Sequence, residues 1–131
     1  MTARTVPADD RVRRGRLAKA EQFADAAVVV RALADEASDV ADAYVTLCVH
    51  AGIAAADTVC AARLGRCARG EDHGSAVTLL ASAEPSAAPH LRALLAMKTL
   101  AGYSHQPVSR DRAVRAGRAM DVLLGVARAA G

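Results

Sequence analysis

The chain has 131 residues, enough for one domain, and 53% of them are apolar while only 2% are aromatic. Alanine, and not β-branched or aromatic residues, dominates the apolar set, which argues against a β-sandwich or barrel; the apolar content also excludes a wholly disordered chain. The formal charge of +3 is weaker than that of a dedicated nucleic-acid-binding domain, although arginines gather in two stretches, 11–16 and 110–118.

The N-terminal stretch, residues 1 to about 15, is charged, lacks apolar periodicity and contains Pro7. We expect it to form a flexible basic arm that precedes one helical domain at residues 16–131. Four arginines at the end of this stretch would give the arm an affinity for nucleic acid: Arg11, Arg13, Arg14 and Arg16.

Two long helices are predicted after the arm. The first runs from about residue 16 to residue 35, where apolar residues recur at steps of three and four. The second runs from about 39 to 66 behind Ser38, a residue type favoured at helix N-caps. Because the second helix is apolar nearly all round, we expect it to lie at the centre of the domain.

Three more helices are predicted beyond a charged loop at 65–74. The third spans about 72–83. The fourth begins near residue 87, between two prolines, and runs to about 103. The fifth starts behind Ser109 and carries an alanine-rich seam with a spacing of three and four.

The predicted fold class is therefore all-α, an up-down antiparallel bundle of four to five helices joined by short links. Alanine seams bury less apolar area per residue than leucine seams, so a monomer of this size would have a small core. We accordingly expect a homodimer that pairs through the fourth and fifth helices or their neighbours.

Cys48, Cys60 and Cys67 form no CxxC pair, so we expect reduced, structural thiols in a reducing cytoplasm. The histidines show no zinc-ligand spacing and the glycines no phosphate-loop motif, so no metal site and no cofactor are expected. The polar N-terminus lacks the apolar stretch of a signal peptide, and acidic residues interrupt the apolar run at 40–64. Cytoplasmic localisation without a membrane partner is therefore expected.

Lys98 lies in the middle of a leucine stripe on the fourth predicted helix. Such a lysine either extends its ammonium into solvent or has an acidic partner. Asp57 and His50 share a narrow polar stripe on the second helix, which is either its solvated side or a seam facing Lys98. In the second case we expect a salt bridge between Lys98 and Asp57, or bonds from each to the Tyr103 hydroxyl or to His50.

Two segments share a pattern: a long alanine-rich helix, a charged loop and a short helix, then a helix end that combines basic, alanine and tyrosine residues. They are HAGIAAADTVCAARLGRCARGEDHGSAVTLL (50–80) and LRALLAMKTLAGYSHQPVSRDRAVRAGRAMDVLL (91–124). Together they resemble the HEPN superfamily (higher eukaryotes and prokaryotes nucleotide-binding), most of all its small actinobacterial members. The resemblance implies an all-α up-down bundle that is usually dimeric.

Many HEPN proteins are metal-independent endoribonucleases, and several are toxins of toxin–antitoxin or phage-defence loci beside a nucleotidyltransferase. Their signature is an arginine followed a few residues later by a histidine, and Lys98 and His105 hold those two places here. Because lysine is a point charge and not a bidentate phosphate ligand, the resemblance favours a non-catalytic member of the superfamily.

Three hypotheses about function follow. The first is a HEPN-like module that binds a nucleotide, RNA or a protein partner, such as a nucleotidyltransferase or an antitoxin, without chemistry of its own. In this module Lys98, Tyr103 and His105 would line a groove at the dimer seam, with Arg66 and Arg69 nearby. The second is a metal-independent endoribonuclease in which His105 is the general acid or base and Lys98 stabilises the phosphate charge. The third is a structural or DNA-associated interaction protein that uses the basic arm.

Overall fold

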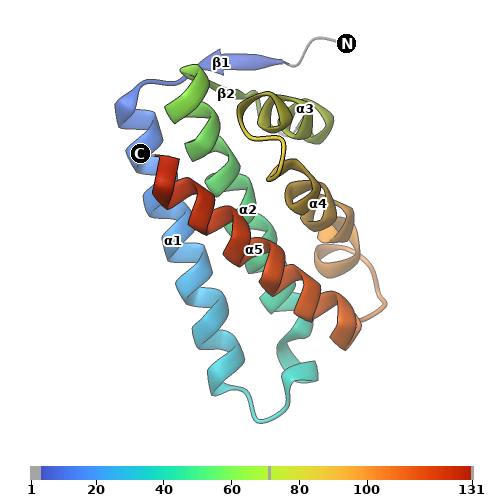
Figure 1. Cartoon of the computed structure of the whole chain (residues 1–131). Helices are drawn as coiled ribbons and strands as arrows, with labels where there is room; N and C mark the ends of the chain where they lie inside the picture. Colours follow the sequence, from blue (N-terminus) through green and yellow to red (C-terminus); the bar gives the residue numbers. More distant parts are fainter. Residues whose placement is uncertain (1–3, 71, 131) are drawn as a thin grey trace.

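The computed structural model describes residues 4–70 and 72–130, and they form an all-α bundle, as predicted (Figure 1). The elements follow in the order β1 (Thr5–Pro7), α1 (Asp10–Leu33), the 3-10 helix η1 (Ala37–Val40), α2 (Ala41–Leu64), β2 (Arg66–Ala68), α3 (His73–Ala83), α4 (Ala88–Gly102) and α5 (Arg110–Ala130). The five α-helices correspond in order to the five that the sequence predicts.

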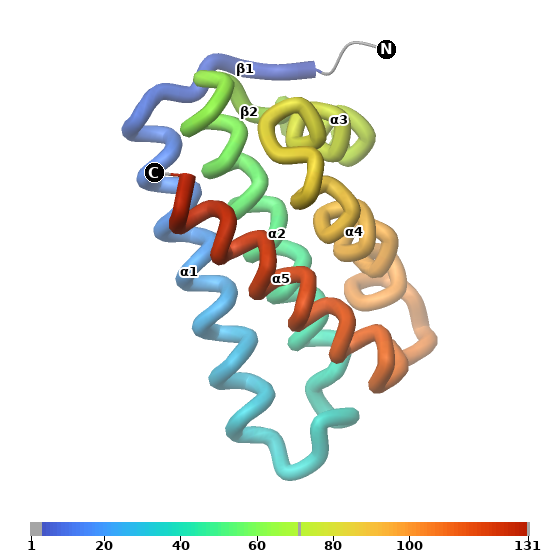
Figure 2. The backbone as a smooth tube through the Cα atoms, viewed as in Figure 1, coloured from blue at the N-terminus to red at the C-terminus, as the bar shows by residue number. Residues whose placement is uncertain are grey.

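The helix α2 is the centre of this arrangement. α1 and α2 form a long antiparallel hairpin, and α5 returns across α2 toward α1 (Figure 2). An ion pair between Arg128 Nε and Glu21 Oε1, 3.2 Å apart, joins the end of α5 to α1. Because α2 also packs against α3 and α4, its predicted central position is confirmed.

Small side chains allow α2 to be surrounded in this way, since its buried residues are mainly alanine, valine and cysteine. At Gly52 the leucines of two other helices reach the α2 backbone. A methyl group added there would overlap the Cδ1 atom of Leu94 on α4 and lie 3.2 Å from Cδ1 of Leu123 on α5. Position 52 requires glycine because these leucines approach the α2 backbone so closely.

The segment Ala37–Leu64 is long and apolar enough to cross a membrane. However, 67% of its most apolar window is buried inside the bundle. A helix that is apolar all round and covered by its neighbours is the core helix expected of a soluble protein.

The three cysteines are free thiols buried in the structure. Burial raises the pKa of Cys48 and of Cys60 to about 12 and also raises that of Cys67. Since the thiolate is the reactive form, these protonated thiols are poor nucleophiles at neutral pH, which agrees with the structural role expected of them.

The N-terminal stretch is not a flexible arm over its described residues. β1 pairs antiparallel with β2, with Val6 opposite Cys67, and the Ala8 N–H donates to the Gly65 carbonyl over 2.9 Å. Ala8 and Cys67 also pack with Ala61 in a small apolar cluster. The charged loop predicted at 65–74 therefore contains a strand. A three-residue strand whose partner is distant in the chain leaves no periodic signal in the sequence.

The helix α1 also begins earlier than predicted, at Asp10. Asp9 caps it, because its carboxylate accepts a hydrogen bond from the Val12 N–H over 3.0 Å. The arginines at 11–16 consequently lie on the first turns of a helix, and the predicted domain boundary at residue 16 is wrong.

The two serine caps had different outcomes. The Ser109 hydroxyl accepts a hydrogen bond from the Arg112 N–H over 3.2 Å, so the predicted cap of α5 is confirmed. The cap predicted at Ser38 is wrong, because η1 leads directly into α2 and the N-cap residue, Val40, has no side-chain cap.

Two glycine variants test the packing around α2. We expect Gly15→Ala to stabilise the protein by about 0.5–1 kcal/mol, because Gly15 lies inside α1 with nothing within 4 Å of an added methyl group. We expect Gly52→Ala to destabilise it by about 1–3 kcal/mol, because Leu94 must leave its packed position. Denaturant unfolding measures both changes, and equal stabilisation by the two variants would contradict the close packing at Gly52.

Candidate functional site

A cavity of about 200 Å³ lies between α2, α3 and α4, beside the link from β2 to α3. Four ionisable side chains line it: His50 and Asp57 from α2, His73 from α3 and Lys98 from α4. Its other walls are mainly apolar, with Ile53 and Leu91 among them. The polar stripe of α2 therefore faces the fourth helix, and the structure brings together three of the residues selected from the sequence.

The contact made by Lys98 defines the chemistry of the cavity. Its Nζ atom lies 3.2 Å from Nε2 of His73, and both residues are half-buried. Because an ammonium group has only donor hydrogens, Nε2 is the acceptor, which places the imidazole proton on Nδ1. No ion pair of Lys98 occurs within residues 4–70 and 72–130. The salt bridge predicted between Lys98 and Asp57 is therefore wrong.

Asp57 pairs instead with Arg16 of α1, whose Nε donates to Oδ2 over 2.9 Å. The two side chains are 18% and 30% exposed, respectively. Burial raises the pKa of Asp57, and the positive charge and hydrogen bond of Arg16 oppose that rise. The ion pair compensates a charge on the core helix, and it engages the carboxylate that lines the same cavity as Lys98.

His50 lies at the mouth of the cavity, with the Phe23 ring tilted beside it at a centroid distance of 5.5 Å. Burial lowers the pKa of His50, and the positive charges of Lys98 and Arg16 lower it further. The imidazole is therefore neutral at pH 7, where it carries one N–H donor and one acceptor nitrogen.

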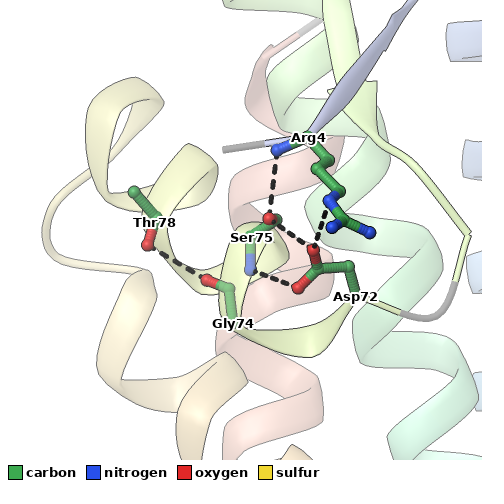
Figure 3. Close-up of polar contacts among 5 residues, drawn as sticks. All are labelled: Arg4, Asp72, Gly74, Ser75 and Thr78. Atoms are coloured by element: carbon green, nitrogen blue, oxygen red, sulfur yellow. Dashed lines mark hydrogen bonds and ion pairs between the residues drawn. The ribbon is translucent and has the colours of Figure 1, made fainter. Parts of the chain in front are cut away.

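Figure 3 shows a hydrogen-bond network at the start of α3, the helix that carries His73. The Asp72 carboxylate caps this helix by accepting from the Ser75 N–H over 3.0 Å, and it also accepts from the Ser75 hydroxyl over 2.8 Å. That hydroxyl in turn accepts from the backbone N–H of Arg4, beside β1, over 3.0 Å. Since His73 is the first residue of α3, the N-terminal segment fixes the end of the helix that carries it.

The four remaining binding or catalytic residues selected from the sequence do not line this cavity within the described chain. Tyr103 is 80% exposed, and His105 is exposed in the link after α4. Arg66 donates from Nε to the Thr5 hydroxyl over 2.6 Å and so supports the strand pair, while Arg69 is exposed. The structure therefore separates the signature residues Lys98 and His105 into different surroundings.

The arginines assigned to the basic arm are largely engaged by carboxylates. Arg13 Nη2 lies 2.6 Å from Asp10 Oδ1, and Arg14 Nη1 lies 3.4 Å from Asp10 Oδ2. Arg16 is held by Asp57, and Arg11 is exposed. This stretch therefore presents less uncompensated charge than its sequence implies.

Two residues of the site, His73 and Arg16, were missed by the sequence reasoning. His73 shares with Ala76 and Leu80 the spacing of one inward helix face, so its position could have been inferred from the third helix. Arg16 belongs to the predicted arm, because the apolar spacing places the start of the first helix near residue 16, whereas Asp9 caps that helix in the structure.

Comparisons with known proteins do not assign the chain to a family: no protein-family model matches it, and no curated protein matches it. Among residues 4–70 and 72–130, no group of three or more histidine, cysteine or acidic side chains is arranged to hold a metal ion.

The cavity is suited to a small anion. Lys98 supplies charge-assisted donor hydrogens, and the neutral His50 imidazole carries one N–H. Whole small-molecule sites have volumes of roughly 300–1,000 Å³. The volume of about 200 Å³ is thus enough for one charged group of a ligand whose remainder lies outside.

Variants of the Arg16–Asp57 pair test the electrostatics of the site. We expect Arg16→Gln to destabilise the protein by about 2 kcal/mol at pH 7, because Asp57 would remain ionised without its partner. Asp57→Asn should change stability much less, since burial outweighs the ion pair in setting the pKa of Asp57 and an amide oxygen can still accept from Arg16.

The pH dependence of unfolding tests whether the stability lost in Arg16→Gln comes from the ionised carboxylate of Asp57. A raised carboxyl pKa means that the folded state loses stability as pH rises through the ordinary value of 3.8 toward the raised one. The deficit of Arg16→Gln should therefore shrink as the pH is lowered toward that range and Asp57 becomes protonated. A deficit that is the same at pH 7 and in mild acid would contradict this assignment.

Proposed function

We propose that this chain is a non-catalytic, HEPN-like helical module that binds a nucleotide, with the nucleotide's phosphate in the cavity between α2, α3 and α4. One observation carries the proposal. The Lys98 ammonium faces the cavity beside His73, while the carboxylate that lines the same cavity, Asp57, is occupied by Arg16.

Phosphate matches these donors better than other small anions do. A phosphate monoester carries about −1.5 to −2 charge at neutral pH and offers three strong acceptor oxygens. Lys98 has donor hydrogens besides the one directed at His73, and His50 can add one N–H, so several acceptors can be satisfied at once. The volume of about 200 Å³ accommodates the phosphate but not the whole nucleotide. The sugar and base would then extend past His50 at the mouth of the cavity.

The arrangement supports binding in preference to catalysis. An endoribonuclease of the HEPN type would need His105 and Lys98 at one phosphate, whereas His105 is exposed in the link after α4 and is absent from the described lining of the cavity. An all-α bundle is the architecture that the HEPN resemblance implies. A homodimer and a nucleotidyltransferase or antitoxin partner are part of the same proposal, and they rest on the resemblance and on the small alanine-rich core.

Calorimetric titration with adenosine 5′-monophosphate tests the proposed function. We expect saturable binding of the nucleotide and none of adenosine, because the phosphate supplies the interaction. Lys98→Gln should weaken binding at least tenfold, whereas Lys19→Gln, the same change at an exposed lysine of α1, should leave it unchanged. Equal affinity for adenosine, or equal loss in the two variants, would contradict the assignment of the cavity.

Incubation of the purified protein with RNA in the presence of a chelator separates the two HEPN hypotheses. The proposed module leaves the RNA intact. Cleavage that persists in the chelator and disappears in His105→Ala would instead support the endoribonuclease.

A further inference from the structure

A second concave site, here called the Arg31 pocket, lies where α1 ends, η1 and α2 begin, and α5 starts. Its volume of about 370 Å³ is within the range of roughly 300–1,000 Å³ that whole small-molecule sites occupy. Its lining combines charged, hydroxyl and small apolar side chains: Arg31, Glu36, Ser38 and Arg110, with Ala37, Ala41, Val108 and Ala113. Among the described residues, it shares none of this lining with the cavity that holds Lys98, and it is large enough for a complete small ligand.

The charged groups of the Arg31 pocket do not neutralise one another. Arg31, Glu36 and Arg110 take part in no ion pair within residues 4–70 and 72–130, although they line the same space. In that part of the chain these three side chains and the Ser38 hydroxyl also make no hydrogen bond. Two positive groups and one negative group are therefore available to a ligand at one place.

The position of Arg31 is defined by an aromatic ring of α2. The guanidinium carbon lies over the Tyr44 ring, 5.5 Å from the ring centroid. The ring itself is fixed by α5, because the Tyr44 hydroxyl packs so closely on Gly117 that a methyl group there would overlap it. A guanidinium that is positioned in advance loses less conformational entropy when it binds a carboxylate.

A hydrogen bond fixes the α5 side of the pocket to α2. The Asp42 carboxylate accepts from the Val108 N–H over 2.9 Å, just before Arg110, the first residue of α5. Three further carboxylates are close in sequence but are not part of the described lining: Asp35, Asp39 and Asp111. Glu36 is therefore the acidic group that a ligand in the pocket would meet.

We propose that the Arg31 pocket binds a free acidic α-amino acid, such as glutamate. The two guanidinium groups bind its two carboxylates, Glu36 binds its ammonium group, and the small apolar residues contact its methylene groups. The single net negative charge of this ligand then matches the single net positive charge of the lining, which has two arginines and one glutamate.

Other small anions match this lining less well. A nucleotide would find no aromatic ring in the described lining on which its base could stack, and its phosphate would lie near the Glu36 carboxylate. A dicarboxylate without an amino group would leave Glu36 unpaired beside further negative charge. The ammonium group is therefore the feature that distinguishes the proposed ligand.

Calorimetric titration with L-glutamate tests the proposal. We expect saturable binding, and Arg110→Gln should weaken it at least about tenfold because a charge-assisted contact to a carboxylate is lost. The matched control is Arg112→Gln, the same change at an exposed arginine of α5 outside the described lining, and it should leave the affinity unchanged. Lys98→Gln should also leave it unchanged, so the result is independent of the proposed nucleotide site.

Glu36 distinguishes an amino acid from a simple dicarboxylate. Glu36→Gln should weaken L-glutamate binding at least about tenfold and strengthen the binding of glutarate, which has the same two carboxylates but no ammonium group. Asp35→Asn, at the neighbouring exposed carboxylate outside the described lining, should change neither affinity. Arg110 and Glu36 are both exposed, so the folded structure should persist in these variants.

Three results would overturn the proposal. The first is the absence of saturable binding of L-glutamate to the unsubstituted chain. The second is a loss of affinity in Arg112→Gln equal to that in Arg110→Gln. The third is glutarate binding as tightly as L-glutamate, which would show that the pocket selects carboxylates without using Glu36.

Discussion

A carboxylate on the core helix is the constraint on which the arrangement of the cavity depends. α2 is covered by four other helices, so Asp57 on this helix must either be neutralised or find a cation. Arg16 provides the cation from α1, and the pKa of Asp57 is still raised because burial outweighs the pairing. The ion pair thus ties α1 to the core helix at some energetic cost.

Arg16 holds the carboxylate of Asp57, the acidic group that lines the same cavity as Lys98. Lys98 contacts an acceptor nitrogen, Nε2 of His73, and keeps its charge available to a ligand. The charge of the cavity is therefore set by a contact between α1 and α2, two helices of which only α2 contributes lining residues. A change at Arg16 should alter both stability and ligand affinity, although Arg16 is not among the residues that line the cavity.

The N-terminal segment has a comparable indirect role. β1 pairs with β2, and the backbone N–H of Arg4, just before β1, donates to the Ser75 hydroxyl. That hydroxyl in turn donates to the Asp72 carboxylate that caps α3. His73 follows that cap directly, so the segment stabilises the helix end from which the imidazole reaches Lys98. A stretch that resembles a nucleic-acid-binding arm in sequence is here part of the support for the site.

The helices could be predicted because their signals are local. Each signal acts within one helix: the apolar spacing, the Ser109 cap of α5 and the prolines at the start of α4. The helices predicted from these signals agree with the structure. The strand pair could not be predicted, since Val6 and Cys67 meet only through the tertiary fold. The grouping of His50, Asp57 and Lys98 followed from helical spacing, but their partners depend on where α1 and α3 begin. Tyr103 and His105 were grouped with Lys98 by a family pattern, and they lie apart from its cavity.

The contact between Lys98 and His73 is the central claim, and imidazole nitrogen NMR tests it most directly. In the free protein at about pH 8, the account predicts that Nε2 of His73 is the unprotonated nitrogen and that Nδ1 carries the proton. It also predicts that adenosine 5′-monophosphate shifts the His73 and His50 nitrogen signals, and that these shifts disappear in Lys98→Gln. A His73 ring protonated at Nε2, with nitrogen signals that do not respond to the nucleotide, would contradict the account.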